Sequence, residues 1–252
     1  MDSLKDIDIN NTIIIFPGRF QPFHKGHNDV YRYLKSVFPH VFITTTNTSS
    51  KKEPERYPFN FKEKVAIMKE LGGVDPIDII PTPTRYPYSD SETLSYIRKM
   101  QGSEDPEISR KFQSIDLNNL VIVFVISRKD SERFKFPKKG LSLKRNHTPA
   151  KIQKLKFKNN INNRNNYLPR FNNINVTQVF ESFNYVLTMP TFPFEILGYT
   201  LKGATEFREM MANPPEDYTS ENVVEDLYEI DIESISPQQE LLLNLIKDKL
   251  IV

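Results

Sequence analysis

Short apolar runs alternate with segments of helical periodicity along the first half of the chain. Runs typical of buried strands are Thr12–Phe16, His40–Thr46, Ile77–Ile80 and Leu120–Ile126. Apolar residues recur at helical spacing in three further segments, Gly26–Phe38, Phe61–Leu71 and Ser91–Met100. Strands that alternate with helices are typical of βαβ units with right-handed crossovers. The pattern therefore predicts an α/β fold built on a parallel sheet.

The second half of the chain adds fewer clear elements. A last strand is predicted at Tyr185–Met189, followed by a proline-rich loop and a helix that begins near Ala204. We therefore expect about five strands in the sheet, with helices on both faces. Pro237–Ile251 reads as an amphipathic helix with its proline in the first turn. Two interpretations of this helix stay open: it docks on its own domain, or it contacts a partner or a second copy.

Composition excludes several classes of protein. The chain has 252 residues, 38% of them hydrophobic, which is enough for one sizeable core. Its net charge of +2 does not indicate a nucleic-acid scaffold, although the stretch from Arg128 to Lys158 is locally basic. The absence of cysteine excludes disulfides, thiolate catalysis and cysteine-ligated zinc.

Two further observations bear on the location of the protein. Met1–Asp6 is charged and lacks the apolar core of a signal peptide. Leu120–Ile126, the longest apolar run, is too short to span a bilayer. We expect a soluble, cytoplasmic protein without a membrane partner.

The candidate chemistry lies directly behind the first predicted strand. Residues 18–27 read Gly-Arg-Phe-Gln-Pro-Phe-His-Lys-Gly-His and end in the first turn of a predicted helix. His24 and His27 are three residues apart, so both can face one point at the start of that helix. A strand-to-helix junction is the usual ligand site of α/β sheets, and helix N-termini favour phosphate. Imidazole N–H groups can donate to phosphate oxygens, so this segment predicts a phosphate-binding site.

Glycines support this interpretation. Gly18 allows a tight turn where a ligand approaches the backbone, and Gly26 leaves room at the start of the helix. The alternative is that His24 and His27 merely cap the helix or pack at its start.

The whole pattern Gly-x-Phe-x-Pro-x-His-x-Gly-His resembles the signature of nucleotidyltransferases with a His-x-Gly-His motif. This Rossmann-like superfamily includes nicotinamide-mononucleotide, phosphopantetheine and glycerol-3-phosphate transferases. The full string looks most like nicotinamide-mononucleotide adenylyltransferases and related phage nucleotidyltransferases. The resemblance implies a Rossmann-like domain over residues 1–215, with an asparagine-rich insertion near 159–175, and an acidic, helical extension over 216–252. A viral protein of this kind would act in the host cytoplasm.

A second family segment, Ile-Ser-x-Thr-x-x-Arg, opens a helix and holds the β- and γ-phosphates of the nucleotide. Residues 202–208 of this chain read Lys-Gly-Ala-Thr-Glu-Phe-Arg and resemble it. Thr205 and Arg208 match the family pattern. Gly203 stands where the family has serine, and Lys202 where it has an apolar residue.

Two intermediate segments extend the resemblance. Tyr57–Lys64 resembles the family's Asn-Pro-Phe…Glu-Lys/Arg segment, while Asn60 is equally compatible with an ordinary helix N-cap. Lys129 and Asp130 follow the strongest strand and resemble the segment that positions the nucleoside or base. Asp130 lies at the carboxyl end of a central strand, as such a role requires. The alternative is a solvated loop of mixed charge.

The resemblance also implies a reaction and roles for these residues. A substrate phosphate would attack the α-phosphorus of a nucleoside triphosphate in line, and pyrophosphate would leave. The protein would catalyse this step by positioning the two substrates and by stabilising the negative charge that develops. Mg²⁺ would be bound with the triphosphate, without a dedicated protein metal site. His24, His27 and Arg208 would act in catalysis. Nucleotide binding would fall to Gly18, Arg19, Phe20, Lys25, Gly26, Asp130 and Thr205.

Three hypotheses follow. The first is transfer of AMP from ATP to nicotinamide mononucleotide, which gives NAD. The second is the same reaction with another phosphorylated acceptor or with CTP. The third is a nucleotidyltransferase-like structural or assembly protein, viral or not, with little or no activity. Gly203, the asparagine-rich segment and the apolar C-terminal helix motivate the third, and that helix would supply any homo-oligomer or partner contact.

Overall fold

The computed structural model describes residues 9–47, 57–82, 87, 90–117, 120–127, 152–154, 175–178, 184–189, 193–231 and 234–250. Asp130 and nearly all of the asparagine-rich segment lie outside these residues. The chain divides into two compact units that are each discontinuous in sequence. The first unit comprises Met1–Pro17, Tyr33–Thr44 and Tyr88–Thr191, and the second comprises Gly18–Arg32, Thr45–Pro87 and Phe192–Val252.

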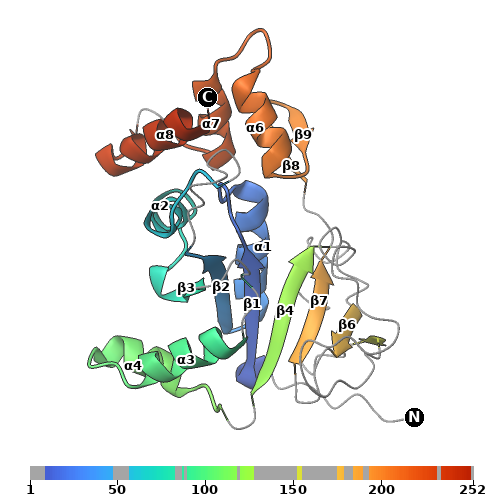
Figure 1. Cartoon of the computed structure of the whole chain (residues 1–252), viewed down its shortest axis with the longest axis vertical. Coiled ribbons are helices and arrows are strands. Elements are labelled where there is room, and N and C mark those ends of the chain that lie inside the picture. Colours follow the sequence, from blue (N-terminus) through green and yellow to red (C-terminus); the bar gives the residue numbers. More distant parts are fainter. Residues whose placement is uncertain are drawn as a thin grey trace. The chain divides into compact units, whose positions relative to one another are not determined.

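The main sheet confirms the predicted α/β class. Its strands are β1 (Thr12–Gly18), β2 (His40–Thr46), β3 (Ile79–Thr82), β4 (Val121–Ser127), β5 (Ile152–Lys154), β6 (Asn175–Gln178) and β7 (Asn184–Met189), in the order β3-β2-β1-β4-β7-β6-β5. The five predicted strands are β1, β2, β3, β4 and β7, whereas β5 and β6 were not predicted. Strand β4 pairs in parallel with β1 and β7, as Figure 1 shows, and the β7–β6 and β6–β5 pairs are antiparallel.

Burial explains the apolar runs within β1 and β4. Ile13, Ile14 and Ile15 of β1 have no solvent exposure, which is what a strand covered on both faces requires. Helices α3 (Asp90–Gln101) and α4 (Pro106–Gln113) belong to the first unit. Helix α4 was not predicted; Asp105 caps its N-terminus, and its Phe112 ring stacks on Phe42 of β2 at 5.7 Å.

The helix predicted at 61–71 is confirmed, and the strand predicted after it needs one correction. Asn60 caps α2 (Phe61–Ala66) in a capping box with Glu63, and the helix continues through a π turn, η2 (Ile67–Leu71). The strand predicted at 77–80 is displaced toward the C-terminus. Residues 76–78 form a 3₁₀ turn, because Asp75 caps it and Pro76 occupies its first position.

The C-terminal part of the second unit is mostly helical. A hairpin of β8 (Phe194–Ile196) and β9 (Tyr199–Leu201) precedes α6 (Ala204–Ala212), α7 (Ser220–Tyr228) and α8 (Pro237–Leu250). The helix predicted near Ala204 and the helix from Pro237 are both confirmed, while the hairpin and α7 were not predicted. Among the described residues, no helix is both long and apolar enough to cross a membrane.

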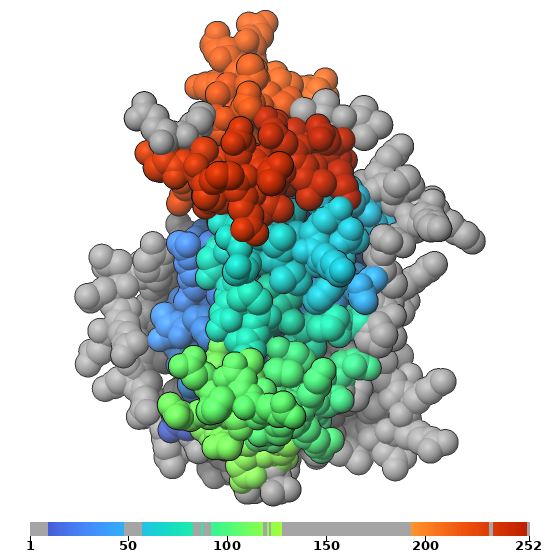
Figure 2. Space-filling view, turned by 90° about the vertical axis from the view of Figure 1, so that its left-hand side faces the viewer, coloured from blue at the N-terminus to red at the C-terminus, as the bar shows by residue number. Residues whose placement is uncertain are grey.

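Helix α8 docks on its own unit. It contacts α6, α7 and η2, and the space-filling view shows it in red against the cyan segment that follows β2 (Figure 2). Its buried residues are Leu242, Leu243, Ile246 and Leu250. A bidentate ion pair adds to this contact, since Lys249 Nζ lies 2.7 Å from each carboxylate oxygen of Glu63. The role of this helix toward a partner stays a prediction.

Candidate active site

The loop between β1 and α1 (Lys25–Val37) is buried from Phe20 to His24, whereas Arg19 is exposed. Phe20 adopts a left-handed backbone conformation, with φ 48°, and its ring packs over Gly18. A Cβ at Gly18 would lie 2.4 Å from Cζ of Phe20. Gly18 is therefore required by the packing of Phe20, which is a different reason from the ligand approach that the sequence suggested.

Gln21 fixes this loop to the segment before α2. Its side-chain Nε2 donates to the carbonyl oxygen of Phe59, and its Oε1 accepts the Phe59 N–H, both at 2.9 Å. The paired bonds bury the amide at 7% exposure without leaving a polar atom unsatisfied. This role of Gln21 does not follow from the sequence, because its partner lies 38 residues further along the chain.

The two motif histidines lie together, as their spacing predicted. Their rings stack with centroids 3.6 Å apart, and Phe194 of β8 stacks on His24 at 4.3 Å. His27 also contacts Phe20 edge-on at 5.0 Å and Phe23 at 5.6 Å. The histidines thus belong to a continuous stack of aromatic rings at the start of α1.

His27 also has the helix-start role that the alternative interpretation gave it. Its Nδ1 accepts the backbone N–H of His24 at 3.4 Å, a long hydrogen bond. The His24 ring also packs at the helix start, but it makes no capping hydrogen bond to the described residues. It is 4% exposed, and neither of its ring nitrogens has a hydrogen-bond partner among the described residues. A buried polar atom without a partner is costly, so His24 offers unused hydrogen-bonding capacity to a ligand.

Burial also sets the charge of the pair. Desolvation lowers the pKa of His24 well below its usual value, and the neighbouring His27 lowers it further. Desolvation lowers the pKa of His27 to about 3. Both imidazoles are therefore neutral near pH 7 in the ligand-free protein. A bound anion would favour their protonated forms, since an opposite charge nearby raises the pKa of a histidine.

Lys25, the cation inside the motif, is held by the end of α7. Its Nζ donates to the backbone oxygen of Asp226 at 3.1 Å and lies 3.9 Å from the Asp226 carboxylate. The same carboxylate accepts the N–H of Leu197 at 2.5 Å. Tyr228 donates its hydroxyl to the carbonyl oxygen of Phe23 at 2.7 Å. None of these α7 residues was expected from the sequence, because the contacts span about 200 positions.

The second motif opens a helix, as predicted. Thr205 is exposed in the first turn of α6, and the Arg208 Nε donates to the carbonyl oxygen of Ala204 at 3.2 Å, one turn earlier. Gly203 is the N-cap, with extended backbone and no side-chain cap. A Cβ at Gly203 would meet nothing within 4 Å. The space for the family's serine is present although its hydroxyl is not.

The other candidate residues divide between loop and helix. Arg19 is exposed, with its guanidinium carbon 5.3 Å from the centre of the Tyr57 ring. Gly26 is buried in the first turn of α1. Among the residues the structure describes, no group of three or more histidine, aspartate or glutamate side chains could hold a metal ion.

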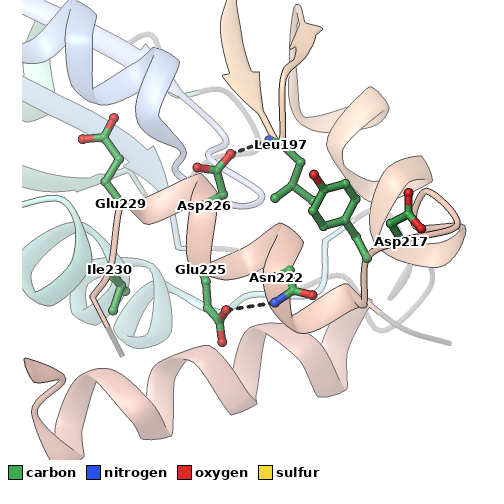
Figure 3. Close-up of a pocket in the computed structure, with 8 residues that line it drawn as sticks. Leu197, Asp217, Asn222, Glu225, Asp226, Glu229 and Ile230 are labelled. Atoms are coloured by element: carbon green, nitrogen blue, oxygen red, sulfur yellow. Dashed lines mark hydrogen bonds between the residues drawn. The ribbon is translucent and has the colours of Figure 1, made fainter. Parts of the chain in front are cut away.

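A pocket of about 450 Å³ lies beside the end of α7 (Figure 3). It is lined by Leu197, Asp217, Tyr218, Asn222, Glu225, Asp226, Glu229 and Ile230. Its four carboxylates would repel phosphate, so we do not assign the nucleotide phosphates to it. Asp226 connects this pocket with the motif. Its carboxylate accepts the N–H of Leu197, and its backbone oxygen accepts a hydrogen bond from Lys25.

Residues 15–85 match the model of the cytidylyltransferase-like family. This part of the chain is similar to that family. The match runs from within β1 to just beyond β3, so it includes both histidines and the loop before them. The resemblance to nucleotidyltransferases is thereby confirmed for this segment. Thr205, Arg208 and Asp130 lie beyond the cytidylyltransferase-like segment.

Curated relatives match the same region. A phosphopantetheine adenylyltransferase from Polynucleobacter necessarius is 33% identical over 66 residues, 26% of this chain and 37% of the relative. Nicotinamide-nucleotide adenylyltransferase 1 from Sulfolobus acidocaldarius is 34% identical over 65 residues, which are 26% of this chain and 37% of the relative. This chain thus spans under half the length of the curated relatives it matches. A bifunctional NMN adenylyltransferase/ADP ribose pyrophosphatase from Francisella tularensis shares 23% identity at a TM-score of 0.30, over 49% of this chain and 34% of that one.

Proposed function

We propose that this chain is an adenylyltransferase that transfers AMP from ATP to a phosphorylated acceptor and releases pyrophosphate. The observation that supports it best is His24, buried against His27 at the start of α1, whose ring nitrogens both lack a hydrogen-bond partner among the described residues. This arrangement lies in the cytidylyltransferase-like segment. A phosphate group would accept a hydrogen bond from an N–H of the His24 ring and would also meet the N-terminus of a 13-residue helix.

The reaction would need little covalent chemistry from the protein. An oxygen of the acceptor phosphate forms a bond to the α-phosphorus, and the bond from that phosphorus to the bridging oxygen breaks. The electron pair leaves with pyrophosphate. His24 and His27, protonated when the triphosphate binds, would neutralise the charge that develops on the phosphoryl oxygens. Thr205 and Arg208 would hold the departing pyrophosphate, and Gly18, Arg19, Phe20, Lys25, Gly26 and Asp130 would complete the nucleotide site.

Mg²⁺ would accompany the triphosphate. It keeps several water ligands and binds phosphate oxygens directly, so it needs few protein ligands.

Nicotinamide mononucleotide is the acceptor that we favour, so the product would be NAD. The string at residues 18–27 and the Sulfolobus relative support it. Phosphopantetheine is the competing acceptor, because the Polynucleobacter relative is a phosphopantetheine adenylyltransferase. A nucleotidyltransferase-like assembly protein is the remaining candidate, and Gly203 in place of the family's serine is the observation that favours it.

Pyrophosphate release by the full chain tests all three candidates. ATP or CTP is offered with nicotinamide mononucleotide, phosphopantetheine or glycerol 3-phosphate, each with Mg²⁺. We expect pyrophosphate release with ATP and one of the acceptors. The rate should fall about 100-fold or more in His27→Asn, because that variant lacks a group that stabilises charge in the transition state. His40→Asn is the matched control, since His40 lies at the start of β2, outside the loop. Absence of release with every pair would leave the assembly protein as the better candidate.

A further inference from the structure

Lys64 of α2 is a lysine buried at 1% exposure, and the proposed reaction does not use it. Its Nζ lies 2.6 Å from the carbonyl oxygen of Thr46, 2.9 Å from the Thr45 hydroxyl and 3.3 Å from the carbonyl oxygen of Arg19. The Thr46 hydroxyl lies further away, at 3.5 Å. An ammonium group has three N–H donors, and each of the three nearer acceptors can take one.

These acceptors come from separate elements of the site. Arg19 belongs to the loop before His24, while Thr45 and Thr46 are the last residues of β2. The Thr45 hydroxyl also donates to the Arg19 carbonyl at 3.4 Å, and Thr82 of β3 donates its hydroxyl to the Thr45 carbonyl at 3.2 Å. The ammonium group therefore joins the motif loop to the end of β2, and the Thr82 hydroxyl joins the end of β2 to the end of β3.

The charge of Lys64 is not balanced by a carboxylate among the described residues. Glu63, its neighbour in α2, pairs with Lys249 instead. The other charged or titratable groups on the motif loop, β2 and α2 are Arg19, His24, His40 and the exposed Lys62. Burial of an unpaired charge is costly, and here it lowers the pKa of Lys64 to about 7.

We propose that Lys64 is a positioning residue for nucleotidyl transfer, and that its ammonium sets the course of the Gly18–His24 loop by holding the Arg19 carbonyl against the end of β2. The inference rests on the proposed function. A neutral amine has two N–H donors and must release one of the three acceptors. The loop is therefore held fully only when Lys64 is protonated. His24 and His27 keep their neutral form through this pH range in the free protein, so they do not produce the same transition.

Two substitutions separate charge from packing. Lys64→Met keeps a long side chain without donors, and Lys64→Arg keeps a permanent charge. In the wild type we expect kcat/KM, whose pH dependence reports groups of the free enzyme, to fall as the pH rises through about 7. Lys64→Arg should lose this dependence, and Lys64→Met should show a kcat lowered roughly 10- to 100-fold at all pH values, with KM for ATP little changed. Lys62→Met is the matched control, because Lys62 is exposed in the same helix.

Hydrogen exchange tests Lys64 independently of turnover. Amides of residues 19–21 and 23, corrected for the intrinsic effect of pH, should exchange faster in Lys64→Met than in the wild type. If Lys64→Met does not fold, Thr45→Val removes one acceptor and should have the same effect. Wild-type exchange in the variant that folds, or an unchanged pH dependence of kcat/KM in Lys64→Arg, would overturn the inference. An inactive wild type with the expected exchange would count against the proposed function alone.

Discussion

The Tyr228 hydroxyl donates a hydrogen bond of 2.7 Å to the carbonyl oxygen of Phe23, the residue that precedes His24. Tyr228 is the last residue of α7, and the bond joins positions 205 residues apart in the chain. Burial raises the pKa of Tyr228, so the hydroxyl keeps its proton and stays a donor over the working pH range. The C-terminal helices thus hold the motif loop directly.

Removing this one donor should affect the site more than the fold. Tyr228→Phe leaves the Phe23 carbonyl without that bond, and we expect about 1 kcal/mol of lost stability. The larger effect should be on kcat, lowered roughly 10-fold because His24 is less firmly placed. Urea unfolding and steady-state kinetics measure the two effects. Tyr199→Phe removes a hydroxyl from an exposed tyrosine and serves as the control. Equal kinetics in both variants would contradict the expectation.

The ion pair between Lys25 and Asp226 should weaken binding of an anionic ligand. Asp226→Asn removes a negative charge 3.9 Å from the Lys25 ammonium and keeps an oxygen for the Leu197 N–H. We expect KM for ATP to fall about three- to tenfold at low salt, with a smaller difference at high salt. Asp217→Asn, in the same pocket, controls for a general change in charge. A higher KM in Asp226→Asn would show that the ion pair supports binding.

Restoring the family's hydroxyl at position 203 should be tolerated. The backbone there is extended, and a Cβ meets nothing within 4 Å, so Gly203→Ser introduces no strain. A serine N-cap should add a few tenths of a kcal/mol to stability. We also expect kcat/KM for ATP to rise several-fold in Gly203→Ser. Gly203→Ala is the control, because it adds the Cβ without the hydroxyl. A rise of the same size in Gly203→Ala would attribute the effect to the Cβ.

The motif histidines should make the protein sensitive to acid. The pKa of His27 is about 3 in the folded protein and about 6.5 in the unfolded chain. Between these values the unfolded chain binds the additional proton, so stability falls as the pH falls from about 6.5 toward 3. His24 acts in the same direction because its pKa is also lowered.

His27→Gln removes one of these protons and should reduce the loss of stability on acidification. Urea unfolding at two pH values between about 6.5 and 3 measures this loss of stability, with His40→Gln as the control. An undiminished loss in His27→Gln would show that other groups cause the acid sensitivity.

The sequence predicted those elements whose signal is local. The apolar run of β1, the capping signal at Asn60 and the proline at the start of α8 each lie within a few residues of what they specify. The 3₁₀ turn before β3 was missed because an apolar run does not show where Asp75 starts a turn. The β8–β9 hairpin has strands of three residues, too short for a periodicity to appear.

In the candidate site, too, the features that follow from local spacing could be predicted from the sequence, and the long-range contacts could not. The sequence by itself determined that two histidines three residues apart would follow a buried strand and lie together at the start of a helix, because the spacing of residues on a helix is fixed. Only the tertiary structure decided that Phe194 covers His24, that Asp226 holds Lys25 and that Lys64 supports the Arg19 carbonyl. These contacts join residues 45 to 201 positions apart or lie between separate elements, and no local pattern encodes them. The same burial lowers the pKa of both histidines and of Lys64, since desolvation depends on everything packed around a group and not on its neighbours in the chain.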